Sequence, residues 1–505
     1  MNVSRVSQLG EGVILKTSAN AFRVFAGLTV SVLLNRVYGQ EQYGTLILVY
    51  SLAALGSVLS DFGTKTTLIR FVPLWLNDGD EQRAVDLFGA SVLIQLAGII
   101  TFGTLMFVSA DLVATHVFLL PGLTPLIHAG VIYFAAFALL DFSLQVFQAL
   151  QDWRRESFLT ILFGHLQIAS VCVIGLVARG SIEWILVGNA VAAVTAVGIA
   201  ARWLPPSFRR ALVGQSRRSF TDACGTVARF GLLLSFQGLY RFGVSWFDKI
   251  LLGRFSSPGV VALYYIASTF LDAFVSVFKV LPAVLAPYIA EISSSDMENL
   301  RRKFTLVFRW LFQASVLVSL GGFFAIEPVV SWLYGPSYAE VVVYARALLI
   351  VFLLRTTREP LGLFLTNAFS QVRVIFIVST SHVGLQILAT AVLVPPYGVW
   401  GAIGALLTAN VVSVVLILVL APIVRAMIPA KCIWASALSF VSAAAVFGVL
   451  RGSALPMVVV GALVLIGYVA VLAALRELRA ADLRVPMEIL RNQRLLPIRT
   501  RSGAG

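Results

Sequence analysis

Long apolar segments, separated by short polar stretches, recur along the whole chain. A bilayer core of roughly 30 Å requires about 20 helical residues to cross it, and about fourteen segments reach that length. They are predicted near 12–34, 43–62, 87–110, 121–148, 157–178, 181–201, 226–252, 260–288, 304–327, 338–366, 374–394, 397–421, 432–450 and 454–475. The boundaries of the fourth and tenth segments are the least sharply marked, which leaves counts down to about twelve open. The pattern predicts an all-α polytopic membrane protein.

The composition supports a membrane location. Of the 505 residues, 59% are hydrophobic and only 12% are charged, which leaves too little polar surface for a soluble protein of this size. The first segment is too long and too charged for a cleaved signal peptide, and no small-residue cleavage site follows it. We therefore expect this segment to be the first membrane span.

Basic residues gather in alternate connections between the predicted spans. The stretch 202–218 and the C-terminal stretch 476–505 are rich in arginine. The intervening loops hold little beyond four arginines, which are Arg36, Arg179, Arg254 and Arg451. Because basic loops resist translocation, this asymmetry predicts a protein of the plasma (inner) membrane with both termini in the cytoplasm. The net charge of +14 would then face anionic lipid head groups, and we expect no nucleic-acid partner.

The sequence offers no catalytic or metal-binding cluster. Its three cysteines and four histidines are scattered among different segments, so we expect neither a structural disulfide nor a metal or cofactor site. The loops predicted to be external are short and carry no paired acids of the kind that glycosyl transfer requires. We therefore expect a protein that is not an enzyme.

Two parts of the chain resemble each other weakly. LLNRVYGQEQYGTLILVYS at 33–51 aligns with LLGRFSSPGVVALYYIAST at 251–269, which places Arg36 and Arg254 at an offset of 218. Such an offset contains about six spans and predicts a parallel duplication. The predicted organisation is an N-lobe at 1–201 (spans 1–6), a basic cytoplasmic linker at 202–225, a C-lobe at 226–421 (spans 7–12), two further spans at 422–475, and a basic cytoplasmic tail at 476–505.

Four stretches rich in glycine, tyrosine and apolar residues follow one another along residues 12–421. They are GQEQYGTLILVYSLAALGSVLSDFG, DKILLGRFSSPGVVALYYIAS, WLYGPSYAEVVVYARALLI and PPYGVWGAIGALLTAN. In their order and spacing they resemble the polysaccharide and O-antigen flippases of the multidrug/oligosaccharidyl-lipid/polysaccharide (MOP) exporter superfamily. The resemblance implies alternating-access transfer of an isoprenoid-pyrophosphate-linked oligosaccharide to the outer leaflet, for O-antigen (lipopolysaccharide), capsule or exopolysaccharide synthesis. It makes glycosyltransferases and a polysaccharide polymerase candidate partners.

Charged and polar residues recur inside the predicted spans. Such residues normally face a bundle interior or a wet cavity, and here the cations outnumber the carboxylates. Because arginine presents forked donors that match phosphate oxygens, we predict a cationic cavity for an anionic head group. Its candidate substrate-binding residues are Arg23, Arg241, Lys279, Arg346, Arg355 and Arg358. Candidate polar lining residues are Asn20, Gln145, Gln237 and Ser245, and candidate ion-coupling residues are Asp61, Asp141, Asp248 and Asp272.

Several of these residues have an alternative role in pairing with each other. Gln237, Arg241, Ser245 and Asp248 are spaced by four, four and three, which predicts one inward stripe on a continuous helix over 226–252. Pairing within spans would join Arg241 with Asp248, Arg355 with Glu359, and Asp272 with Lys279. We favour pairing for Arg355, and substrate contact for Arg23 and Arg241, which have no acid at i±3 or i±4. We favour neutralisation of a nearby cation for Asp61, Asp141 and Asp272, and snorkelling for Lys249.

Three other functions remain open at this stage. A flippase for a peptidoglycan lipid precursor would share the span count and the cationic cavity. A multidrug exporter of the same superfamily would be expected to carry an excess of buried carboxylates, which this sequence lacks. A membrane glycosyltransferase or ligase would need catalytic acids at the membrane face.

The uneven distribution of Lys and Arg between alternate loops generates a prediction about topology. In a cysteine-free variant, single cysteines at Gln40 and Ser337 should react with an impermeant thiol reagent applied to intact cells, whereas one at Ser216 should not. Labelling of all three cysteines after permeabilisation provides the control. Labelling of Ser216→Cys in intact cells would invert the predicted orientation.

Overall fold

The computed structural model describes residues 3–211, 217–278, 297–367, 371–450, 457–475 and 477, and every element in these ranges is helical. The first part contains α1 (Val3–Leu59), α2 (Thr64–Asn77), α3 (Glu81–Val108), α4 (Ala110–Leu112), η1 (Val113–Val117), η2 (Pro121–Leu123), α5 (Thr124–Ala149), α6 (Trp153–Val171), η3 (Cys172–Val177), α7 (Ile182–Trp203) and α8 (Pro206–Ala211). The second contains α9 (Arg217–Thr226), η4 (Val227–Gly231), α10 (Leu232–Ser245), α11 (Phe247–Phe255), α12 (Pro258–Phe278), α14 (Met297–Tyr334), η5 (Pro336–Tyr338), α15 (Ala339–Asn367), α16 (Val372–Tyr397), α17 (Val399–Leu420), α18 (Pro422–Met427), α19 (Ala430–Leu450) and α20 (Met457–Ala474).

Among the described residues, 11 helical segments are long and apolar enough to cross a membrane. The first of them, Leu15–Leu59, has 45 residues and covers the first two predicted spans. A straight helix of that length would measure about 68 Å, roughly twice the bilayer core. α1 instead bends at Gly39, whose φ of 80° lies in the left-handed region that glycine adopts without strain. The predicted count of fourteen spans stays a prediction.

The predicted continuous helix over 226–252 is wrong. α10 ends at Ser245 and α11 begins at Phe247, because Trp246 between them has a φ of −132° and a ψ of −24°. The start of α11 is stabilised by Asp248, whose carboxylate accepts a hydrogen bond of 2.9 Å from the backbone N–H of Lys249. Asp248 therefore belongs to a second helix and does not continue the stripe predicted on α10.

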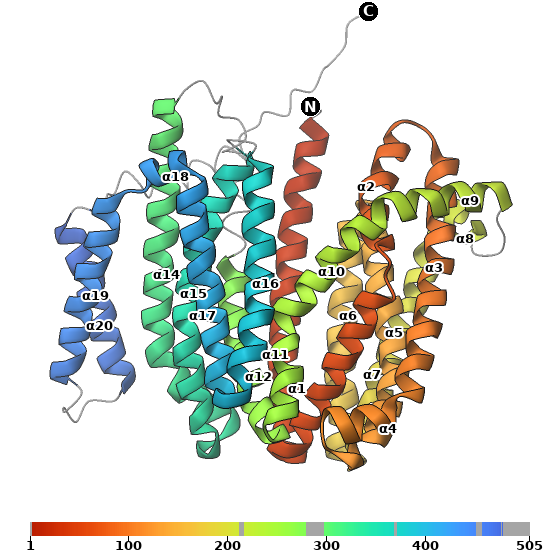
Figure 1. The fold of residues 1–505 in the computed structure, drawn as a ribbon, viewed down its shortest axis with the longest axis horizontal. Coiled ribbons are helices and arrows are strands. Elements are labelled where there is room, and N and C mark those ends of the chain that lie inside the picture. The colour runs from red at the N-terminus through yellow and green to blue at the C-terminus, as the bar shows by residue number, and fades with distance from the viewer. Residues whose placement is uncertain are drawn as a thin grey trace, which may run out of the picture.

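Figure 1 shows α2 to α7 on one side of α1 and α14 to α17 on the other, with α19 and α20 at the edge. The largest hydrophobic cluster joins the two sides, and it includes Leu46 of α1, Tyr264 of α12 and Phe352 of α15. α19 and α20 pack on α14 through a separate cluster that contains Phe324 and Tyr468. Burial of apolar surface thus holds both sides and the outlying pair in one bundle.

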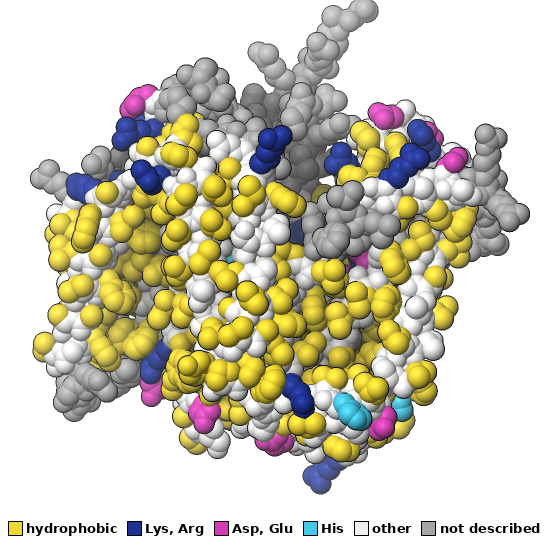
Figure 2. Space-filling view, viewed as in Figure 1, with side chains coloured by type: hydrophobic (Ala, Val, Ile, Leu, Met, Phe, Trp, Pro, Cys, Tyr) yellow, Lys and Arg dark blue, Asp and Glu magenta, His cyan; other side chains and the backbone are white. Residues whose placement is uncertain are grey.

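The outer flank of the bundle is apolar and its charges lie at the ends. Figure 2 shows hydrophobic side chains over the height of the helices, with Lys and Arg gathered mainly at the end where the N-terminus lies. Large apolar side chains such as Ile100 and Trp332 are 67% and 77% exposed. A surface of this kind suits contact with lipid, so the chain is a multi-pass membrane protein.

Close packing between α16 and α17 generates a prediction about stability. A Cβ on Gly401 would overlap the backbone carbonyl of Leu393, whereas a Cβ on Gly404 would lie 3.7 Å from the Leu393 side chain in ordinary contact. Gly401→Ala should therefore lower the free energy of unfolding by about 1–3 kcal/mol, and Gly404→Ala should leave it nearly unchanged. Thermal unfolding of the two variants in detergent measures the difference, and equal melting temperatures would contradict this packing.

Candidate functional site

Residues 36–42, at the bend of α1, contact the ends of two helices from the other side of the bundle. We call this segment the α1 elbow. The Arg36 guanidinium donates hydrogen bonds of 2.9 Å to the carbonyl oxygens of Leu333 and Trp332, at the C-terminal end of α14. The Glu41 carboxylate accepts a 3.1 Å hydrogen bond from the backbone N–H of Gly259, at the beginning of α12. Each charge matches the partial charge of the helix end that it contacts.

Buried hydroxyl groups close the same end of the bundle. Tyr334 donates a hydrogen bond of 3.0 Å to the Ser31 hydroxyl, and Tyr338 donates one of 3.1 Å to the Asn35 side-chain oxygen. A Cβ on Gly44 would overlap the carbonyl group of Pro258, so the two chains approach closely here. At the elbow end, α1 is therefore joined to α12, α14 and η5 by polar groups as well as by apolar packing.

Asp141 on α5 forms an ion pair with a lysine. Its carboxylate lies 2.7 Å from the Lys65 ammonium group on α2, and Lys65 is only 7% exposed. Asp61 lies at the junction of α1 and α2, where its carboxylate accepts hydrogen bonds from the Thr64 hydroxyl and from the Lys65 backbone N–H. Asp61 thus caps α2, and Asp141 neutralises a cation.

Asp248 pairs with its neighbour in the chain. Its carboxylate lies 3.0 Å from the Lys249 ammonium group and accepts a 2.6 Å hydrogen bond from the Tyr264 hydroxyl. Lys249 also donates to the carbonyl oxygen of Ser245 at 2.7 Å. Both charged residues are buried, so the predicted snorkelling of Lys249 is wrong. The break at Trp246 explains the difference, because it turns Lys249 toward the interior of the bundle.

Two predicted substrate-binding arginines lie together on α15. Arg355 and Arg358 are half-buried and within electrostatic range of His382 on α16. His382 is buried, and its Nδ1 lies 2.9 Å from the Ser413 hydroxyl and 3.1 Å from the Ala409 carbonyl oxygen. Arg358 also interacts with a residue other than His382. The side chain of Glu359, the predicted partner of Arg355, lies outside the described residues, and Arg355 forms no ion pair with any side chain within them.

Arg23 lies on α1 at some distance from the elbow. Its side chain is exposed and is within electrostatic range of Glu156 on α6, and Glu156 forms an ion pair of 3.4 Å with Lys16. Asn20, one turn before Arg23, is half-buried. Across the described residues, Arg23 makes no ion pair. Two described cations of α1, Lys16 and Arg23, therefore lie near the Glu156 carboxylate.

The remaining predicted residues are not all near these groups. Arg346 forms a 2.7 Å ion pair with Glu327 and donates a 3.0 Å hydrogen bond to the Phe323 carbonyl oxygen, which ties α15 to α14. Asp272 and Ser245 are exposed, and Gln145 is half-buried one turn after Asp141. The side chains of Arg241 and Gln237, and all of Lys279, lie outside the described residues.

Sequence reasoning missed the elbow contacts and the buried lysines. Lys65 lies between the predicted spans 43–62 and 87–110, where a loop is expected, yet it is buried against Asp141. Arg36 was read only as a loop arginine, although its alignment with Arg254 marked it as a repeated feature. Its partners lie 296 and 297 residues away in sequence, which local patterns cannot reveal.

Solved structures share this architecture. The chain superposes on the lipid II flippase MurJ in an inward closed conformation with a TM-score of 0.64 and 13% identity, covering 91% of this chain and 98% of MurJ. An inward-facing multidrug resistance MATE family transporter of the MOP superfamily gives a TM-score of 0.61 at 14% identity, covering 80% and 95% of the two chains. These likenesses establish a MurJ- and MATE-like fold.

Sequence relatives provide a second line of comparison. The probable flippase AglR of Haloferax volcanii is 29% identical over 228 residues, which cover 44% of this chain and 46% of that protein, so the match spans about half the length of each. The family described as polysaccharide biosynthesis protein matches residues 9–293, which is more than half of the chain. The chain therefore belongs to the polysaccharide biosynthesis protein family.

Proposed function

We propose that this protein is a flippase that moves an isoprenoid-pyrophosphate-linked oligosaccharide from the cytoplasmic to the outer leaflet of the plasma membrane. It would work by alternating access in the synthesis of a surface polysaccharide such as O-antigen, capsule or exopolysaccharide. Family membership supports a role in polysaccharide synthesis, and the fold supports transport. The head group of such a substrate is a pyrophosphate anion.

The distribution of paired and unpaired charges carries this proposal. Asp141 and Asp248 are each neutralised by a lysine, whereas Arg23 and Arg355 form no ion pair with another side chain that the structure describes, Glu359 not being among these. An unpaired cation within a span costs roughly 2.5–3.5 kcal/mol on insertion scales, so such residues usually serve a function. An anionic substrate would neutralise them.

The same charges argue against the multidrug alternative. A transporter of organic cations needs carboxylates that are free to bind them, and here both Asp141 and Asp248 already bind lysine. Of the four predicted ion-coupling residues, Asp61 caps a helix and Asp272 is exposed. Asp272 is therefore the first residue to change if transport proves to depend on an ion gradient.

We also propose that the elbow end is the outer end and that this structure is closed there. The beginning of α1 and most surface Lys and Arg would then lie on the cytoplasmic side. Release of substrate to the outer leaflet requires the elbow contacts to separate, so Arg36, Glu41, Ser31 and Asn35 would exchange partners during each cycle.

The unpaired arginines generate the central functional prediction. Arg23→Gln and Arg355→Gln should each reduce transport of a fluorescent lipid-linked oligosaccharide in reconstituted vesicles by about tenfold or more, because each removes a charge-assisted contact to the pyrophosphate. Arg→Lys at either position should retain part of the activity, since the charge survives without the forked geometry.

Two controls separate this prediction from general damage. Arg425→Gln, at an exposed position on α18, should transport normally. Arg346→Gln should lower thermal stability, because it removes the tie to Glu327 and Phe323. Normal transport by both Arg23→Gln and Arg355→Gln would refute the proposed cationic site. Repeating the assay with the lipid-linked peptidoglycan precursor compares the two candidate substrates directly.

The elbow generates a separate prediction about the transport cycle. In a cysteine-free background, Glu41→Cys combined with Gly259→Cys should form a disulfide, because a side chain at position 259 would meet Glu41 and Gln40 directly. Oxidation should stop transport, and reductant should restore it. The two single-cysteine variants serve as controls, and undiminished transport by the oxidised double variant would mean that the elbow does not open.

A further inference from the structure

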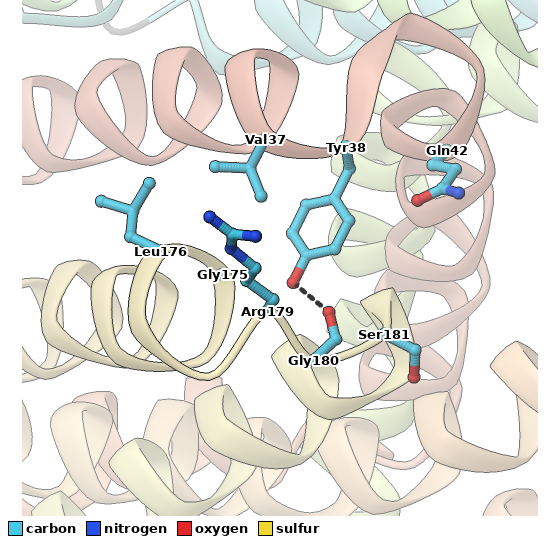
Figure 3. Close-up of a pocket in the computed structure, with 8 residues that line it drawn as sticks. All are labelled: Val37, Tyr38, Gln42, Gly175, Leu176, Arg179, Gly180 and Ser181. Carbon is cyan, nitrogen blue, oxygen red and sulfur yellow. Dashed lines mark hydrogen bonds between the residues drawn. The ribbon is translucent and has the colours of Figure 1, made fainter.

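A pocket of about 650 Å³ lies beside the α1 elbow, and none of the predicted substrate-binding residues lines it. Its walls come from the elbow on one side and from the turn between η3 and α7 on the other. Figure 3 shows the Arg179 side chain extending from this turn toward α1, between the side chains of Leu176 and Tyr38. The volume falls within the range of about 300–1,000 Å³ that is usual for small-molecule sites.

Arg179 supplies the pocket with an available positive charge. It is exposed, and none of the described residues forms an ion pair with it. Tyr38 donates its hydroxyl hydrogen to the Gly180 carbonyl oxygen at 2.8 Å, which fixes the turn against α1. Gln42 and Ser181 add neutral polar groups to the lining. Glu183 is within electrostatic range of Tyr38 but does not line the pocket.

The backbone at Arg179 is held in an unusual conformation. Its φ of 49° lies in the left-handed region, which favours glycine, although Gly180 follows directly and does not adopt it. An arginine in this conformation carries a cost that glycine would avoid. This backbone conformation directs the Arg179 guanidinium toward the elbow, where a ligand would contact it.

The surroundings of the pocket indicate a lipid. Arg179 follows the candidate span Trp153–Val177 by two residues, which places it at the level of the lipid head groups. Leu176 and Val177, just before it, are 52% and 80% exposed on the apolar flank. Trp184, just after it, is 58% exposed, as is usual for aromatic residues at the interface. A ligand here would meet a cation at its head and apolar surface along its tail.

We propose that this pocket binds the phosphate of a membrane lipid, with Arg179 as the principal contact. Gln42 donates an additional hydrogen bond to the head group, and the acyl or isoprenoid chain lies along Leu176 and Val177. The site is independent of the proposed transport function. Only its assignment to the outer leaflet rests on the orientation proposed above.

A protection assay tests this site without any transport readout. Ser181 lines the pocket, so Ser181→Cys in a cysteine-free background, in detergent, should react with a thiol reagent at a rate that falls as dioctanoyl phosphatidylglycerol is added. A short-chain isoprenyl phosphate, dioctanoylglycerol and inorganic phosphate form the comparison arms. Ser337→Cys, which is exposed at the same end of the bundle outside the pocket lining, reports general effects of added lipid.

The variants at Arg179 make the assay specific. Arg179→Gly removes the charge while relaxing the left-handed backbone, so it should keep or raise thermal stability and yet increase the half-saturating lipid concentration about tenfold. Arg179→Lys should show a smaller increase. Protection by either phosphorylated lipid that is lost in Arg179→Gly supports the site. The proposed site is overturned if the lipids still protect Ser181→Cys in the Arg179→Gly variant. It is also overturned if dioctanoylglycerol or inorganic phosphate protects equally well.

Discussion

The structure depends on the way the α1 elbow joins the two sides of the bundle at one end. Gly39 lets α1 reverse direction, and the residues around it present opposite charges to two helix termini of opposite polarity. Contacts between a surface charge and a helix end contribute about 0.3–1 kcal/mol each, and neutral hydrogen bonds contribute about 0.5–1.5 kcal/mol. The five hydrogen bonds described at this end would therefore stabilise the arrangement seen here by a few kcal/mol. That amount is enough to favour one state and small enough for substrate binding to reverse it, because a shift from 1:99 to 99:1 requires roughly 5.5 kcal/mol.

The charged residues of the candidate site differ in whether they form an ion pair with a described residue. The half-buried Asp141 and the buried Asp248 each form an ion pair with a buried lysine, so these pairs bring no net charge into the bundle. Arg23 and Arg355 form no ion pair with another described side chain, and a pyrophosphate head group would offset their charge. Moving one charge through 100 mV is worth roughly 2.3 kcal/mol, so an interior-negative potential would favour outward movement of an anionic head group whose charge is not fully offset. The arithmetic therefore does not require coupling to protons or sodium, and it agrees with the engagement of Asp141 and Asp248 by lysine.

Hydropathy predicted much of the fold, because a membrane helix must be apolar over a length set by the bilayer. Hydropathy did not predict where a helix bends or breaks, because this depends on the backbone dihedral angles of single residues. Nothing in composition distinguishes the bend at Gly39 from a loop, or the break at Trp246 from a continuous helix. The sequence placed Arg355 and Arg358 on one span and Arg23 on the first span, and their role in substrate binding stays a prediction. It could not find Lys65 beside Asp141, because pairing across helices depends on packing and leaves no periodic signal.

The weak internal repeat gains a physical meaning at the elbow. Glu41 and Gly259 are 218 residues apart, which is the offset that aligns Arg36 with Arg254, so the contact joins two equivalent positions of the proposed repeat. Copies related by a two-fold axis touch at equivalent positions only near that axis. The elbow would therefore lie where rocking of the two lobes produces the smallest displacement, and a few short contacts there could hold or release the whole outer end. Val37, Tyr38 and Gln42 line the lipid pocket while their neighbours Arg36 and Glu41 hold the helix ends. A lipid that binds the pocket more tightly in one arrangement of the elbow must favour that arrangement by the same free energy, which makes the membrane itself a participant in the closure of this end.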